Sequence, residues 1–394
     1  MGYKENELNI NSILLALFIS INMLTKIITT VYNFNNNIVI ITSLILGSSL
    51  IYNKFKINKL FIFINLIILL LFFLSMLRVS DHTFLIDYLL NYIIYGLTAT
   101  YLISFKVDFA KVTSVINLIF LAFTIVLFIE YIPKINSNLY LDFTMDLSYT
   151  SMIGISSVLL SSKYWKGKLV LTIINLTAVT INLWYLLILS NNRGAIVSLF
   201  ILLLLVSIKR VKNNSLKFII FISAITVISL ILMNIKVVLL TINNIVSSFL
   251  GTRINWLDRF LFQIDQGDIL TGRAGLYNNA SVLIEGNPIF GVGIGYFELF
   301  NNGQYPHNIF IQLFTEFGVL IASVVSLLLI VGLYMCIASK VEDNYMELLR
   351  FFFILSIPRL MLSTTYWKLH FFWLFIFLCI LILRKKLRVK ERRV

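Results

Sequence analysis

The sequence is poor in charged residues, cysteine and histidine. Charged residues make up 13% of its 394 residues, and it has only two cysteines and three histidines. Both cysteines, Cys336 and Cys379, lie inside apolar runs, so we expect neither a disulfide framework nor a thiolate metal site. The sequence also lacks an acidic metal-binding cluster. We therefore predict no metal and no cofactor.

Apolar residues are abundant instead. They make up 59% of the chain, and the mean hydropathy is +0.93, whereas a soluble domain carries about a quarter charged residues. The sequence predicts an all-α polytopic membrane protein, with residues 1–394 forming one integral membrane domain. Because Glu5 and Glu7 precede the first apolar run and no cleavage site follows it, we interpret that run as a membrane helix rather than a signal peptide.

Twelve segments come close to the roughly 20 apolar residues that a membrane-spanning helix needs. The sixth and eighth of these segments are short, and the tenth is too long. The predicted spans are 8–31, 37–53, 60–77, 84–104, 112–132, 147–162, 168–189, 194–208, 217–240, 308–339, 347–365 and 369–383.

The basic residues fix an orientation for these spans. With the N-terminus in the cytoplasm, 21 of the 32 Lys and Arg residues fall in inside segments and seven in outside segments. Cytoplasmic loops carry such an excess of Lys and Arg. We therefore predict that both termini lie in the cytoplasm and that the long loop faces outward. The net charge of +14 reflects this orientation, so no nucleic-acid partner is predicted.

One long stretch does not cross the membrane. Residues 241–307, between the ninth and tenth spans, contain no run long enough to do so. A loop of this length is usually functional or disordered, and its aromatic residues argue for order. We predict one large extracytoplasmic loop that carries the chemistry.

Ser190 to Gly194 (Ser-Asn-Asn-Arg-Gly) opens the eighth span at the outer surface. Asn191 or Asn192 can cap the new helix, whose first N–H groups form an anion site. Arg193 adds a charged fork that matches phosphate oxygens. A snorkelling arginine at the membrane edge is the alternative interpretation.

The large loop holds three more arginines. Arg273 begins a predicted amphipathic helix that ends near Gly286 and Pro288, and it is a second candidate anion ligand. Arg253 and Arg259 have acidic neighbours, so surface ion pairs are the simpler interpretation for them.

Two other motifs lie in this loop. Phe290 to Gly295 (Phe-Gly-Val-Gly-Ile-Gly) lacks the βαβ context of a dinucleotide site, so we expect these glycines to allow tight turns or close backbone approach. In Tyr305 to Asn308 (Tyr-Pro-His-Asn), His307 stands at the outer end of the tenth span. It is either a polar anchor or a residue for proton transfer near neutral pH.

These motifs together resemble a known family. Asn-Asn-Arg-Gly, a long outer loop with Gly-Arg, then Asn-Pro-Ile-Phe-Gly-Val-Gly-Ile-Gly-Tyr-Phe, Pro-His-Asn-Ile-Phe-Ile-Gln and Glu-Phe-Gly (Glu316 to Gly318) follow in the order found in the O-antigen ligase and Wzy-type polysaccharide polymerase superfamily. The resemblance covers roughly residues 185–330.

This resemblance implies a GT-C-like, metal-independent glycosyltransferase of the bacterial inner membrane that uses a glycan on undecaprenyl pyrophosphate. By similarity, Arg193 and Arg273 hold the pyrophosphate and His307 acts on the acceptor hydroxyl as base or orienter. Paired arginines can stabilise the leaving group without a metal. The further predicted substrate-binding residues are Arg253, Arg259, Tyr305 and Asn308.

Three functions stay open. A polymerase transfers the chain to the next lipid-linked repeat unit, and a ligase transfers it to lipid A-core. We favour the polymerase because the chain is aromatic and rich in Asn, Ile and Lys, as divergent polymerases are. A chain-length regulator protein is then an expected partner, beside membrane lipid. The third candidate is a flippase, with Lys26 and Lys236 lining a polar path; neither has an obvious embedded acidic partner in the sequence.

Overall fold

The computed structural model consists of helices joined by short connections, and the residues it describes contain no strand. Those residues are 2–32, 37–134, 143–165, 167–190, 192–211, 213–233, 235–250, 255–266, 272–339 and 343–391.

The first half of the chain contains the helices that precede Arg193. They are α1 (Gly2–Ile19), α2 (Ile21–Tyr32), α3 (Asn37–Tyr52), α4 (Lys59–Met76), α5 (Thr83–Asn91), η1 (Tyr92–Leu97), α6 (Thr98–Ile103), α7 (Phe109–Val126), η2 (Leu127–Tyr131), η3 (Ile132–Lys134), α8 (Phe143–Leu160), η5 (Ser162–Trp165), α9 (Leu169–Trp184) and η6 (Tyr185–Leu189).

The second half contains the large loop and the last bundle helices. They are α10 (Arg193–Lys209), α11 (Asn214–Met233), α12 (Ile235–Leu250), α13 (Asn255–Asp265), α14 (Ala274–Gly286), α15 (Tyr296–Phe300), α16 (Ile309–Ala338), α17 (Asn344–Leu362), η7 (Tyr366–Lys368) and α18 (His370–Glu391).

All twelve predicted spans coincide with helical segments, which confirms the all-α class and the membrane character of the chain. By length and apolar composition, four helical stretches in the described part can cross a bilayer: 59–76, 109–131, 169–189 and 309–338. The pair 8–19 and 21–30, bent by 65°, makes a fifth. Twelve crossings and the GT-C-like arrangement stay predictions.

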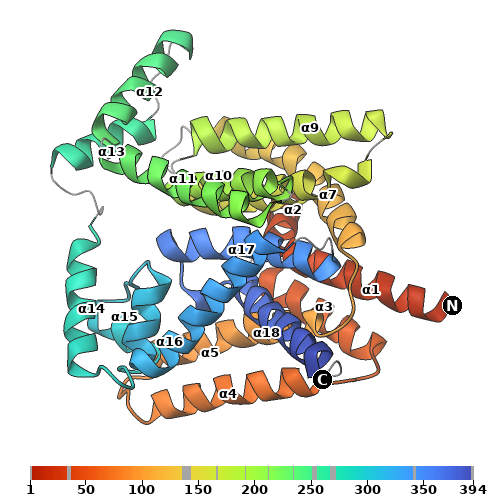
Figure 1. Cartoon of the computed structure of the whole chain (residues 1–394), viewed down its shortest axis with the longest axis vertical. Helices are drawn as coiled ribbons and strands as arrows, with labels where there is room; N and C mark the ends of the chain where they lie inside the picture. The colour runs from red at the N-terminus through yellow and green to blue at the C-terminus, as the bar shows by residue number, and fades with distance from the viewer. Residues whose placement is uncertain are drawn as a thin grey trace.

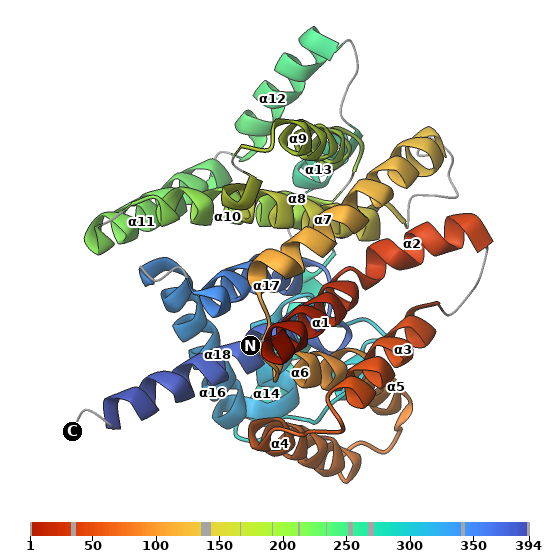
Figure 2. The same ribbon diagram turned by 90° about the vertical axis from the view of Figure 1, so that its right-hand side faces the viewer.

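Helix α17 lies at the centre of the bundle. Figure 2 shows it between the group of α7, α8 and α10 on one side and α3, α4 and α18 on the other, and it packs against α8, α10, α16 and α18. Leu348, Leu349, Phe351 and Phe352 on this helix are fully buried. Because buried apolar area is the main stabilising contribution, these side chains hold the two groups of helices together.

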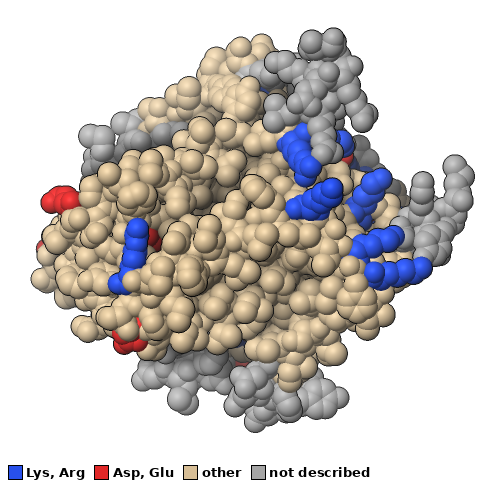
Figure 3. Space-filling view, turned by 90° about the horizontal axis from the view of Figure 1, so that it is seen from below, with Lys and Arg blue, Asp and Glu red and all other residues tan. Residues whose placement is uncertain are grey.

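Helix α4 shows how the bundle meets its surroundings. It lies at the edge of the structure in Figure 1, and Phe63, Leu66 and Leu70 are exposed by 63%, 61% and 54%. Seen from that side, the charged side chains gather toward the ends and leave a broad uncharged band (Figure 3). An apolar patch of this extent is expected where lipid tails cover the protein.

The segments of the predicted large loop gather at one end of the bundle. Figure 1 shows α12 to α15 on the side away from the N-terminus. The predicted ninth span, 217–240, falls on two helices, α11 and α12, and its crossing of the membrane stays a prediction. Helix α12 packs on α13, where Leu239 and Leu261 form a small buried cluster and Lys236 pairs with Asp265 at 2.6 Å.

The glycine motif packs against a break in α16. At Gly318 (φ 64°) the helix is interrupted, and Val319 N–H donates to Pro288 O at 2.8 Å instead of to the helix. The freed carbonyls of Thr315 and Glu316 accept hydrogen bonds from Val292 and Gly293 N–H, at 2.8 and 3.0 Å. The prediction that these glycines allow close backbone approach is confirmed.

A side chain at Gly318 has no space. A Cβ there would lie 2.4 Å from the Ile289 carbonyl carbon, at a backbone conformation that favours glycine. We expect Gly318→Ala to lower the free energy of unfolding by about 3 kcal/mol, from the left-handed backbone and overpacking. Thermal unfolding of the detergent-solubilised protein measures it. Gly275→Ala on α14, where nothing lies within 4 Å, is the control and should unfold no earlier than the unmodified chain.

Candidate functional site

Arg193 stands at the first position of α10. Asn192 caps this helix as predicted: its Oδ1 accepts hydrogen bonds from Gly194 and Ala195 N–H at 3.0 and 3.3 Å. The Arg193 guanidinium lies over the Phe260 ring, 3.9 Å from its centroid, and donates to Gln263 Oε1 at 3.2 Å. Since both partners are on α13, the helix of the large loop holds this arginine in place.

Arg273 precedes α14, the helix predicted to follow it. Its guanidinium donates to Leu362 O at 2.7 Å, at the C-terminal end of α17. A cation is stabilised there because the last carbonyls of a helix lack partners and carry partial negative charge. Arg193 and Arg273 lie near enough to repel each other electrostatically. Two positive charges in one partly buried place favour an anion between them.

His307 lies in a turn that begins α16. Its φ of 54° is left-handed, a conformation in which His is enriched among non-glycine residues. The next residue, Asn308, caps α16 by accepting hydrogen bonds from Phe310 and Ile311 N–H. The imidazole packs on Tyr305 with ring centroids 4.0 Å apart, and its buried Nδ1 has no hydrogen-bond partner among the described residues.

The His307 imidazole is neutral at pH 7. Burial, reinforced by the positive charge of Arg273, lowers the pKa of His307 to about 4. The charged form is disfavoured both by loss of water and by the nearby cation. A neutral imidazole keeps a lone pair that can accept a hydrogen bond, or a proton, from a hydroxyl group.

The C-terminal end of α17 is where these segments meet. Tyr305 OH donates to Ser363 O at 2.7 Å, and the Ser363 hydroxyl lies 2.7 Å from the Tyr149 hydroxyl of α8. Burial raises the pKa of Tyr305, and the positive charges of Arg359 and Arg273 oppose this, so both guanidinium groups lie close to its phenol. Residues far apart in sequence thus form one site, which we call the cationic site: Arg193, Arg273, His307, Tyr305 and Arg359.

Arg359 was not predicted as a site residue. It lies in the predicted span 347–365, and its guanidinium stands over the Tyr149 ring, 4.5 Å from the centroid. An arginine inside an apolar span is itself a signal of function, and this signal identifies Arg359 from the sequence.

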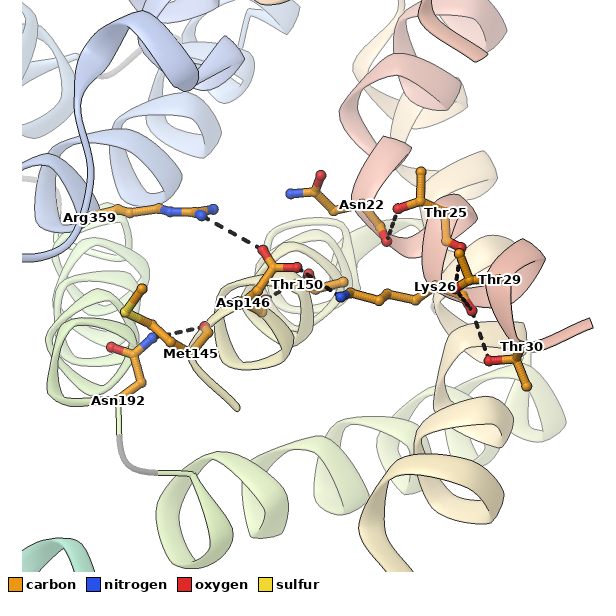
Figure 4. Close-up of polar contacts among 10 residues, drawn as sticks. All are labelled: Asn22, Thr25, Lys26, Thr29, Thr30, Met145, Asp146, Thr150, Asn192 and Arg359. Atoms are coloured by element: carbon orange, nitrogen blue, oxygen red, sulfur yellow. Dashed lines mark hydrogen bonds and ion pairs between the residues drawn. The ribbon is translucent and has the colours of Figure 1, made fainter. Parts of the chain in front are cut away.

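Asp146 links Arg359 to Lys26. Figure 4 shows the carboxylate between the two cations, with Lys26 Nζ at 3.2 Å and Arg359 Nη2 at 3.8 Å. Asp146 is thus an acidic partner of Lys26 that the sequence did not make obvious, whereas Lys236 pairs with Asp265 at an exposed position on α13. These partners come from distant turns of the chain, so hydropathy alone does not reveal them.

The other predicted ligands have different outcomes. Arg253 lies outside the described residues, as does Asp268. Arg259 lies on α13, whose Asp258 accepts from Asn243 at 2.9 Å and whose Asp265 pairs with Lys236. Their role in binding stays a prediction.

A buried polar network joins α16, the helix that follows His307, to the segment after α17. Glu316 accepts hydrogen bonds from Tyr366 OH, from Trp367 Nε1 at 3.2 Å and from Gln312 Nε2 at 2.7 Å. Gln312 also donates to Thr365 at 2.8 Å. Because its hydrogen bonds are satisfied inside the protein, this network fixes the first turns of α16, and therefore His307, against the segment that follows α17.

One cavity lies elsewhere. A groove of about 580 Å³ runs beside the glycine motif, lined by Arg78, Leu283, residues 287–292 and Tyr296. None of the residues of the cationic site lines it. Among the described residues, no group of three or more His, Cys, Asp or Glu side chains forms a possible metal site.

The comparisons with known proteins identify one region of the chain. Residues 178–326 match the family model described as O-Antigen ligase. The matched region runs from α9 to the first half of α16, and contains Arg193, Arg273 and His307. No curated protein and no solved structure matches the chain.

Proposed function

We propose, from the match of residues 178–326 to the family model described as O-Antigen ligase, that the protein is a polysaccharide polymerase of the inner membrane. It transfers a glycan chain from undecaprenyl pyrophosphate onto the next lipid-linked repeat unit, at the outer face of the membrane. The observation that carries the proposal is the convergence of Arg193, Arg273 and His307, from three distant segments, at the end of α17.

The two arginines account for the leaving group. As the bond between the anomeric carbon and the diphosphate oxygen breaks, negative charge builds up on the diphosphate. Guanidinium groups that are already in place stabilise this charge most strongly in the transition state. Arg193, stacked on Phe260, and Arg273, held at the α17 carbonyl, are both preorganised in this way.

His307 accounts for the acceptor. The acceptor hydroxyl oxygen forms the new bond to the anomeric carbon and gives up its proton, and the neutral imidazole of His307 is the group we assign to accept it. The aromatic ring of Tyr305 supports the imidazole from one side. No step needs a metal ion, because the donor brings its own leaving group.

A ligase is the second candidate, since the matching family model carries that description. The donor chemistry is the same in both cases, and only the acceptor differs. A flippase explains the charge of Lys26 less well, because Asp146 balances it.

The test is purified protein supplied with a synthetic undecaprenyl-pyrophosphate repeat unit. We expect glycans of many repeat units from this substrate alone, and an unchanged rate in EDTA. Product only after addition of lipid A-core assigns the ligase. No glycosidic bond with either acceptor contradicts both enzymes. In a deletion strain, single repeat units should remain at the outer face; accumulation on the cytoplasmic side instead supports the flippase.

A further inference from the structure

The charges around Asp146 are arranged unequally. Lys26 Nζ approaches Asp146 Oδ2 to 3.2 Å, within hydrogen-bond distance, whereas Arg359 Nη2 stays 3.8 Å from Oδ1. A contact of 3.8 Å is an ion pair without a hydrogen bond. Lys26 therefore neutralises most of the carboxylate charge, and Arg359 keeps donors that this carboxylate does not use.

Arg359 is poorly satisfied for a guanidinium in its position. Its side chain is only 15% exposed, and its buried Nε has no hydrogen-bond partner among the described residues. The guanidinium also packs on the Tyr149 ring, with its central carbon 4.5 Å from the ring centroid. A buried guanidinium costs free energy unless its donors are paired, which points to a missing anionic partner.

Arg359 faces the same site as the two predicted arginines. Its charge acts on Tyr305 together with that of Arg273. Tyr149, on which it stacks, meets Ser363, and Ser363 O accepts the Tyr305 hydroxyl. On the other side, Asn192 Nδ2 donates to Met145 O, so the residue before Asp146 is tied to the residue before Arg193 (Figure 4).

We infer that Arg359 is a third guanidinium ligand of the lipid diphosphate. In the empty site it lies beside Asp146, whose charge Lys26 balances. This inference rests on the proposed function and extends its donor site. A diphosphate carries two negatively charged phosphate groups. Three guanidinium groups can pair with more of its oxygen atoms than two can. Asp146 keeps Arg359 oriented while the site is empty and releases it when the substrate arrives.

The experiment titrates farnesyl diphosphate and farnesyl monophosphate onto the purified full-length chain in detergent. Arg359→Gln should weaken diphosphate binding roughly 30-fold or more, and monophosphate binding much less, so the preference for diphosphate shrinks. Asp146→Asn should act in the opposite direction, tightening diphosphate binding about two- to fivefold. A purely structural pair would make both substitutions weaken binding.

Two further variants keep the test decisive. Lys368→Gln removes a cation from an exposed ion pair, with Asp87 at 2.8 Å, and should bind like the unmodified chain. Arg359→Lys keeps the ion pair but not the fork, and should bind with intermediate affinity even if Arg359→Gln does not fold.

Each negative result has its own meaning. Equal diphosphate affinity in Arg359→Gln and Lys368→Gln, with affinity still lost in Arg273→Ala, overturns the role of Arg359 alone. Diphosphate binding by the unmodified chain that is no tighter than farnesol binding overturns the donor site and, with it, the proposed function.

Discussion

Arg273→Ala is expected to slow glycan transfer by about 10²- to 10³-fold, the usual loss when one preorganised donor to a developing anion is removed. The substitution removes a charge that lies close to Arg193 and that, in the proposed mechanism, stabilises the leaving diphosphate. Arg273→Lys should recover only part of the rate, because a point charge replaces a fork already aligned by Leu362 O. The initial rate of polymer formation from the synthetic repeat unit measures both.

The control for Arg273 is Lys236→Ala, which removes a cation of α12, the helix that leads into the large loop. Lys236 lies in an exposed ion pair with Asp265, so its loss should change the rate by less than about threefold. Protein levels in the membrane should be equal for all three variants. Normal chain length in Arg273→Ala, at normal protein level, removes this arginine from the mechanism.

His307→Ala is expected to lower the rate by about 10²- to 10⁴-fold, the range for loss of a general base. Binding of farnesyl diphosphate should stay within a fewfold of normal, because the imidazole acts on the acceptor rather than the donor. Farnesyl diphosphate binding therefore distinguishes the two residues, because Arg273→Ala should weaken this binding as well as slow the reaction. A normal rate in His307→Ala makes this histidine an interfacial anchor only.

The pH profile tests the same imidazole without mutation. Since burial and Arg273 lower the pKa of His307 to about 4, the neutral form persists well below pH 6. We expect kcat/KM, which reports the free enzyme, to stay level down to about pH 5 and to fall below it. Bound diphosphate offsets the charge of Arg273, so kcat should begin to fall at a higher pH. A decline of kcat/KM already near pH 6.5 contradicts this environment for the base.

The sequence predicts local features well. Asn192 caps α10, α14 follows Arg273, and the glycine motif makes a close backbone approach, all as expected. These features depend on residues near one another in the chain, where capping and backbone conformation decide the outcome.

Contacts between distant segments are what the sequence does not show. The Lys26–Asp146–Arg359 interaction joins α2, α8 and α17, which hydropathy treats as three unrelated helices. The packing of α12 on α13 and the Lys236–Asp265 pair are likewise tertiary contacts that the sequence does not show. Periodicity identifies a helix but not its neighbours.

The interruption at Gly318 divides α16 into two parts, and the length of the second part can be compared with the thickness of a bilayer. Beyond it, 319–338 are about 20 residues, which rise about 30 Å and equal the hydrocarbon layer. The turns before it, from Asn308 to Phe317, are hydrogen-bonded to the glycine motif, and the break at Gly318 separates them from residues 319–338. We therefore expect the glycine motif, rather than the register of residues 319–338 in the lipid, to set the position of the His307 imidazole.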